Sequence, residues 1–132
     1  MSNTKVTSGS PFEDIIGFSR AVRVGDYIAV SGTAPLDKDG KTCSIGDPGL
    51  QARHCFEIIK KALRDTGSDI KDVIRTRIFL KNIGDWHSVA LIHAEYFKHI
   101  KPATTVIEVS GFVNPEWLVE IEADAIATCN NK

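Results

Sequence analysis

The sequence predicts an α/β protein of the α+β kind, with two helices packed on one face of a mixed β-sheet. Three observations lead to this fold class. Several segments alternate apolar and polar residues as strands do, and residues 50–66 show the three-and-four apolar spacing of an amphipathic helix. Clusters of Gly, Pro, Asn and Asp separate these segments. The expected order is β-β-α-β-α-β-β, within one domain that spans residues 1–132.

The first two strands are expected to form a hairpin. Residues 18–24 alternate in character, Gly25 and Asp26 form a turn signal, and residues 27–31 resume with β-branched side chains. Turn-forming residues at 36–40 and 46–49 then predict a loop before the first helix.

The helices are expected at residues 50–66 and 86–97. Gly67 provides the stop signal of the first helix, and Asp85 is the expected N-cap of the second. Further strands are expected at residues 72–80, 104–109 and 118–128. Because two helices cover only one face of such a sheet, the other face must contact something else.

Composition and charge limit the classes of function. The chain has 132 residues, of which 42% are hydrophobic, so it can fill the core of one domain. Its net charge of -1 provides no basic surface, and we expect no nucleic-acid partner. No apolar run approaches a membrane span, and residues 1–10 lack the apolar centre of a signal peptide. We therefore expect a soluble cytoplasmic protein without a membrane partner, flexible at residues 1–10 and 130–132.

The residues that most often bind metals show no metal-binding pattern. Cys43, Cys55 and Cys129 lack Cys-x-x-Cys spacing, which favours reduced thiols, and Cys55 lies on the apolar stripe of the first helix. The four histidines have no third ligand at a suitable spacing, and no phosphate-binding loop occurs. We expect neither a metal nor a cofactor. The histidines are His54, His87, His93 and His99.

The last strand carries a row of carboxylates, Glu120, Glu122 and Asp124, on the face opposite its apolar residues. The middle strand is expected to place Arg75, Arg77 and Phe79 on that same face, and the first strand adds Arg20 and Val22. The opposite rows are Ile74, Thr76, Ile78 and Leu80 in the middle strand and Ser19, Ala21 and Arg23 in the first.

Two interpretations of this charged face are possible. It could be a solvated face with surface ion pairs, each worth about 0–1 kcal/mol. The presence of Phe79 among the charges favours burial of the face in an oligomer. Arg75, Arg77, Glu122 and Asp124 would then form a charge network at the interface.

Several stretches, taken in order, resemble the Rid/YjgF family, whose oldest label is endoribonuclease L-PSP. They are Gly17-Phe-Ser-Arg-Ala-Val-Arg-Val-Gly25 with Val30-Ser-Gly-Thr33, Asp72-Val-Ile-Arg-Thr-Arg-Ile-Phe-Leu80, Pro102-Ala-Thr-Thr-Val106 and Val119-Glu-Ile-Glu-Ala123. The resemblance implies a homotrimer of the chorismate-mutase-like (bacillus type) fold, with a small-molecule cleft at each subunit boundary. It also implies hydrolysis of reactive enamines or imines to ketoacids and ammonia.

The resemblance implies roles for particular residues. Glu120 matches the acid that orients or activates water, and Thr104 stands where the best-known members carry an arginine that holds the substrate carboxylate. A threonine hydroxyl cannot replace that charged fork. The chain therefore resembles an arginine-less subgroup of the family. The implied substrate-binding residues are Phe18, Gly32, Thr33, Ala90, His93, Thr104 and Thr105.

Two functions remain open at this point. The first is a deaminase or hydrolase acting on C=N bonds, with Glu120 as general base and His93 as a second acid–base group. The second is a non-catalytic ligand-binding or chaperone-like trimer, favoured by the loss of the arginine. A ribonuclease ranks last, because the chain has neither a basic surface nor a pair of acid–base histidines.

Overall fold

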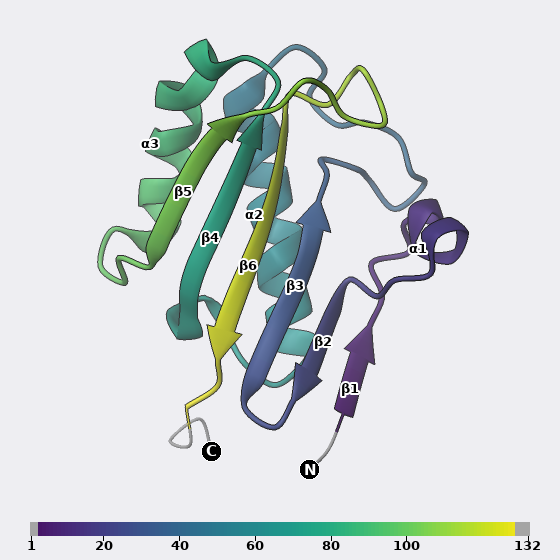
Figure 1. Ribbon diagram of the computed structural model, residues 1–132, viewed down its shortest axis with the longest axis vertical. Coiled ribbons are helices and arrows are strands. Elements are labelled where there is room, and N and C mark those ends of the chain that lie inside the picture. Colours follow the sequence, from purple (N-terminus) through teal and green to yellow (C-terminus); the bar gives the residue numbers. More distant parts are fainter. Residues whose placement is uncertain (1–2, 129–132) are drawn as a thin grey trace.

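A six-stranded mixed sheet forms one layer of the molecule, as seen in the computed structural model, which describes residues 3–128. The strands lie in the order β1-β2-β3-β6-β4-β5 (Figure 1). The β4 and β5 strands pair in parallel, and the other neighbours are antiparallel. The strands are β1 (Asn3–Val6), β2 (Ala21–Val24), β3 (Tyr27–Thr33), β4 (Val73–Leu80), β5 (Ala103–Glu108) and β6 (Val119–Ile126).

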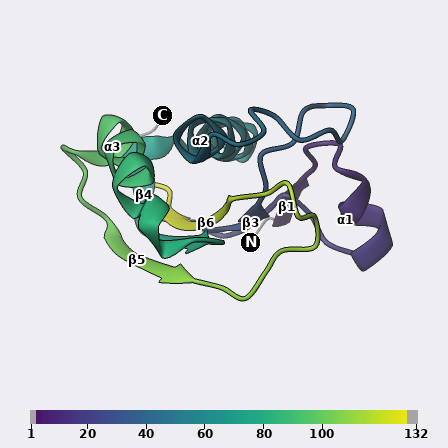
Figure 2. The same cartoon turned by 90° about the horizontal axis from the view of Figure 1, so that it is seen from above.

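Two long helices, α2 (Pro48–Asp65) and α3 (Trp86–Phe97), cover one face of this sheet (Figure 2). The predicted α+β class, with two helices on one face, is confirmed. A short helix, α1 (Pro11–Ile16), lies beside the sheet near β1 and β2 (Figure 1), and two 3-10 turns, η1 (Ile70–Asp72) and η2 (Ile83–Asp85), precede β4 and α3. No helix within residues 3–128 combines the length and apolar character that crossing a membrane requires.

The helix boundaries follow capping chemistry, with one exception. Asp47 accepts a hydrogen bond from the Leu50 amide at 3.0 Å, and Pro48 occupies the first helical position of α2. Asp85 occupies the N-cap position of α3 as predicted, but its side chain makes no capping hydrogen bond. The reason is that η2 runs directly into α3, which leaves Asp85 with helical backbone angles rather than the extended ones of a cap.

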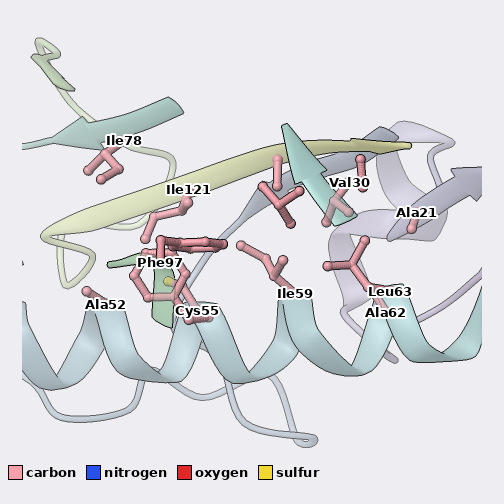
Figure 3. Close-up of a cluster of buried hydrophobic side chains, with 14 of the residues drawn as sticks. Ala21, Val30, Ala52, Cys55, Ile59, Ala62, Leu63, Ile78, Phe97 and Ile121 are labelled. Carbon is pink, nitrogen blue, oxygen red and sulfur yellow. The ribbon is translucent and has the colours of Figure 1, made fainter. Parts of the chain in front are cut away.

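The hydrophobic core lies between α2, α3 and the sheet. Figure 3 shows Cys55 and Ile59 of α2 directed at Ile121 of β6, with Phe97 of α3 beside them. Cys55 is fully buried, as predicted, and burial raises the pKa of its thiol well above the usual value. This thiol is therefore part of the core.

The N-terminal segment differs from the prediction. Residues 1–10 were expected to be flexible, whereas Asn3–Val6 form β1, paired with β2, and Ser10 caps α1 by accepting from the Phe12 amide. A four-residue strand has too short an alternation to stand out in the sequence. Cys129 and residues 130–132 lie outside the described residues.

One residue of the predicted core row in β4 faces the other way. Thr76, Ile78 and Leu80 are buried as expected, but Ile74 is 49% exposed. The pairing of β4 with β6 shifts between Val73 and Arg75, which indicates a bulge at this point. The extra residue reverses the alternation, so Val73 takes the buried position.

Candidate functional site

A groove of about 940 Å³ opens at the end of β3, where the N-terminal segment, α1, α2 and residues 113–117 meet. Four of the predicted site residues line it: Phe18, Gly32, Thr33 and Glu120. Residues more than 80 positions apart in the sequence thus share one wall, because β3 and β6 are adjacent in the sheet.

Glu120 lies directly over Gly32. A Cβ atom at position 32 would stand 3.3 Å from both Cδ and Oε2 of Glu120. The β3–β6 register shifts between Val30 and Thr33, which places Gly32 within the irregular part of the strand pair. The missing side chain therefore allows the carboxylate to rest against the backbone of β3.

The environment of Glu120 raises the pKa of its carboxyl group. Burial is the largest cause, the negative charge of Glu122 adds to it, and the positive charge of Arg20 opposes it. The arginine that acts on Glu120 is Arg20, not Arg75 or Arg77 of the charged sheet face. A carboxylate with a raised pKa is suited to take a proton from water and to return it.

Arg20 is the buried cation of this site, with only 4% of its surface exposed. Its Nη1 donates to the carbonyl oxygen of Gly32 at 2.6 Å and to Oγ1 of Thr33 at 3.1 Å. The guanidinium carbon lies 5.3 Å from the centre of the Phe18 ring, within the range of a cation–π contact. The sequence placed Arg20 on the charged sheet face and missed this role. The sequence signal for it was an arginine directly before β2, seven positions after Glu13.

Glu13 balances the charge of Arg20 from the other side. Its Oε2 lies 3.7 Å from Nη2 of Arg20, and both residues are buried. Although burial opposes it, hydrogen bonds from Thr7 and Ser8 lower the pKa of Glu13, so this carboxylate stays ionised. With Glu13 and Glu120 as its neighbours, Arg20 has no unpaired charge to offer a substrate carboxylate.

The hydroxyl of Thr33 is used within the protein. It donates to the carbonyl oxygen of Ser31 at 2.8 Å and accepts from Arg20. Thr33 was predicted to bind substrate; it lines the groove, and both of these hydrogen bonds of its hydroxyl are made within the protein.

A second, smaller pocket of about 90 Å³ lies between α3 and β5, and three other predicted site residues line it: Ala90, His93 and Thr104. Thr105 lines neither pocket, because consecutive residues of β5 point to opposite faces. The predicted site residues thus form two groups within one chain. The strand β4 lies between Thr104 on β5 and Glu120 on β6, so the two residues are two strand spacings apart across the sheet, or about 10 Å. They are also offset by three residues along it, because Thr104 pairs with Thr76 and Glu120 with Phe79.

A chain of hydrogen bonds links two residues of the second pocket, His93 and Thr104, through Thr76. Thr104 Oγ1 donates to the carbonyl oxygen of Pro102 at 3.2 Å, and Thr76 Oγ1 lies 2.8 Å from Thr104 Oγ1 and 2.9 Å from His93 Nε2. Because Thr104 donates to Pro102, Thr76 donates to Thr104, and Nε2–H of His93 donates to Thr76. Burial lowers the pKa of His93, which keeps the imidazole neutral. This pocket therefore presents only neutral groups around Thr104.

The uncovered face of the sheet carries the predicted charge network in part. Arg77 pairs with Glu122 at 3.0 Å and with Asp124 at 3.3 Å. Arg75 is on the same face, but it forms no ion pair with any residue between 3 and 128. Within the same range, no three His, Cys, Asp or Glu side chains are grouped to hold a metal ion.

The comparison with known proteins assigns the chain to a family. The family model described as endoribonuclease L-PSP matches residues 9–127. The chain belongs to this family. The resemblance to the Rid/YjgF proteins, which share the family, is thereby confirmed.

Similar sequences and structures cover nearly the whole chain. The crystal structure of the Mycobacterium tuberculosis member of the YjgF/YER057c/UK114 family is 40% identical, with a TM-score of 0.87 over 96% of this chain and 100% of that one. An uncharacterised protein of Streptomyces coelicolor is 38% identical over 92% of this chain and 90% of its own length. The 3-aminoacrylate deaminase RutC of Acinetobacter baylyi is 36% identical over 80% of this chain and 82% of its own.

Proposed function

We propose that this protein is a hydrolase that deaminates a small imine or enamine, with Glu120 as the general base. The observation that carries the proposal is the carboxylate of Glu120, held over Gly32 beside the buried Arg20 with its pKa raised by burial. The similarity to RutC of Acinetobacter baylyi, named a 3-aminoacrylate deaminase, supports the same reaction class.

The proposed chemistry uses one carboxylate in two steps. Glu120 takes a proton from water while the water oxygen forms a bond to the carbon of the protonated imine, and the C=N electron pair moves to nitrogen to give a neutral carbinolamine. Glu120 then returns its proton to the nitrogen. The C–N bond breaks and ammonia leaves as the carbinolamine hydroxyl gives its proton to Glu120 and the carbonyl forms, and Glu120 passes that proton to ammonia. An enamine enters the same route after protonation at carbon. Arg20 stabilises the ionised carboxylate and keeps the Gly32 carbonyl in place.

The separation of the two groups of site residues supports a cleft shared between subunits. In a homotrimer, the neutral pocket of one subunit could complete the Glu120 groove of the next. The uncovered sheet face favours such an assembly, since it combines the Arg77 network with Phe79 and the exposed Ile74.

The proposed substrate has no carboxylate beside its C=N bond. Thr104 is tied to Pro102 and Thr76, and Arg20 is already balanced by Glu13 and Glu120, so neither offers a free cation. In this respect the substrate differs from 3-aminoacrylate, the compound in the name of the relative.

A matched pair of imines tests the proposal. An amino-acid oxidase acting on leucine generates the imine with a carboxylate, and an amine oxidase acting on isoamylamine generates the same side chain without it. We expect the protein to accelerate ammonia release from the second imine and not from the first, and Glu120→Ala to abolish the effect. Thr104→Arg should transfer part of the activity to the carboxylate-bearing imine. Wild-type protein that accelerates neither reaction contradicts the proposal.

A non-catalytic ligand-binding trimer is the second candidate, and the neutral hydrogen-bond chain of His93, Thr76 and Thr104 favours it. In that case Glu120→Ala would leave ligand affinity unchanged and no imine would be turned over. The two candidates therefore differ in turnover, not in binding.

A further inference from the structure

The groove beside Glu120 is far larger than a small imine needs. Its volume of about 940 Å³ lies at the upper end of the range of about 300–1,000 Å³ for pockets that hold drug-sized ligands. Apolar side chains from α1, α2 and two loops make up much of its wall, among them Phe12, Ile16, Leu36, Ile58, Val113 and Trp117.

Trp117 has an unused hydrogen-bond donor in this wall. The residue is 4% exposed and packs edge-to-face on Phe12, with ring centres 5.5 Å apart. Its indole Nε1 is buried and has no hydrogen-bond partner within residues 3–128. Buried indole N–H groups almost always find an acceptor, because the water they lose must be replaced. An acceptor atom on a bound molecule would supply this partner.

The charged residues of the groove do not select a charged ligand. Lys61 pairs with Asp65 at 2.7 Å, and Asp37 accepts from the amides of Asp39 and Lys41. Arg20 is balanced by Glu13 and Glu120, as described above, and Lys38 is exposed. Apart from Lys38, the charged side chains are thus engaged within the protein, and the space next to Glu120 is mostly apolar.

Two apolar side chains of the groove are open to solvent. Val113 is 74% exposed and Ile16 is 66% exposed, although both line the groove. Apolar groups in such positions gain from contact with an apolar ligand, which would remove them from water.

We propose that the groove binds the apolar body of the substrate, an aryl or branched alkyl group with one hydrogen-bond acceptor that receives the Trp117 indole N–H. This proposal rests on the proposed function for its reacting end, since Glu120 lines the same groove. The substrate class is then an uncharged imine or enamine with a bulky apolar substituent. Its hydrolysis product is the corresponding ketone or aldehyde.

Binding of ketones tests the groove without any need for turnover. Isothermal titration calorimetry measures the affinity of the protein for three ketones, butanone, benzylacetone and anisylacetone. Benzylacetone adds an aryl group to butanone, and anisylacetone adds an ether oxygen to that ring. We expect benzylacetone to bind about 10- to 100-fold more tightly than butanone, because burial of an aryl side chain favours binding by such a factor. Anisylacetone should bind more tightly again. Equal affinities for butanone and benzylacetone would overturn the proposal.

Three variants locate the bound ketone. Trp117→Phe removes the donor and keeps an aromatic ring, so it should remove the preference for anisylacetone over benzylacetone. Val113→Asp, at an exposed position, should weaken the binding of both aryl ketones at least about 10-fold. Leu91→Asp, on the exposed face of α3 outside the groove, should leave the binding of both unchanged. Unchanged binding by Val113→Asp would place the ligand elsewhere and would also overturn the proposal.

The outcomes separate this inference from the proposed function. Aryl ketone binding without any imine turnover would leave the apolar site standing and contradict the hydrolase. Turnover of the isoamylamine-derived imine without preference for aryl ketones would support the hydrolase and contradict the apolar site. The wild-type ligand series needs no variant, so a folding defect in Trp117→Phe would not decide the result.

Discussion

Arg20 holds the backbone of Gly32 beneath the carboxylate of Glu120, with Nη1 donating to the Gly32 carbonyl oxygen at 2.6 Å. This contact joins the buried charge pair of the N-terminal segment to the candidate catalytic carboxylate. Changes on either side of it should therefore have separable effects on stability and on activity.

Gly32→Ala should lower activity with little loss of stability. The added Cβ would stand 3.3 Å from Glu120, and the group that must move is the end of a flexible side chain. We expect kcat for a carboxylate-free imine to fall about 10-fold or more, since small displacements of a catalytic group are costly. Gly84→Ala is the matched control, because no atom lies within 4 Å of its Cβ position. A normal kcat in Gly32→Ala would argue against the proposed role of Glu120.

Glu120→Gln should stabilise the fold at neutral pH. Burial raises the pKa of Glu120 above its ordinary value of 4.5, so the folded state binds a proton more readily than the unfolded state. Stability is therefore lost as the pH rises from the ordinary pKa through the raised one, and glutamine, which mimics the protonated acid, avoids this loss. Thermal unfolding at several pH values should show the advantage of Glu120→Gln at pH 7 and its disappearance below pH 4.5. A lower Tm of the variant at pH 7 would contradict the sign.

The same raised pKa should appear in the rate. Glu120 must be ionised to accept a proton from water, so kcat/KM should fall on the acid side, with its midpoint above the ordinary glutamate value of 4.5. A pH–rate profile of the wild type measures this limb directly. A midpoint at or below the ordinary value would assign the limb to another group.

Arg20→Met should destabilise the fold strongly. It leaves the buried Glu13 carboxylate and the Gly32 carbonyl oxygen without this partner, and breaking a buried pair on one side costs about 3–5 kcal/mol. The double variant Arg20→Met with Glu13→Gln should recover part of the loss, because the buried charge is then gone. Urea unfolding of the single and the double variant measures the difference in their free energies of unfolding. If Arg20→Met lowers the free energy of unfolding by less than about 1 kcal/mol, which is the contribution of a surface ion pair, this charge pair is not buried in solution.

Charge reversal on the uncovered sheet face should disrupt the proposed trimer. Arg77→Glu would place a third acid beside Glu122 and Asp124, with which Arg77 now pairs at 3.0 and 3.3 Å. Sedimentation should show a trimeric wild type and a smaller species for this variant. Arg53→Glu is the matched control, because it breaks a 2.8 Å ion pair with Glu95 between the two helices, away from that face. A wild type that sediments near 14.5 kDa would contradict the trimer itself.

Regular elements with long periodic patterns were predictable from the sequence. The α2 helix, expected at residues 50–66, and the carboxylate row of β6 follow directly from residue spacing, because alternation and helical periodicity decide which face is buried. The four-residue β1, the bulge at Ile74 and the missing cap at Asp85 were not predictable, since each depends on a neighbouring segment rather than on a local pattern.

The sequence by itself determined the α+β class and the family, and it proposed Glu120 and Thr104 as site residues. Only the tertiary structure decided how these residues are grouped. It placed Arg20 with Glu120 and Gly32, Thr104 with Thr76 and His93, and an unpartnered Trp117 donor in the groove wall. The physical reason is that burial and hydrogen-bond partners come from strand order and register across the sheet, which bring together residues far apart in the chain.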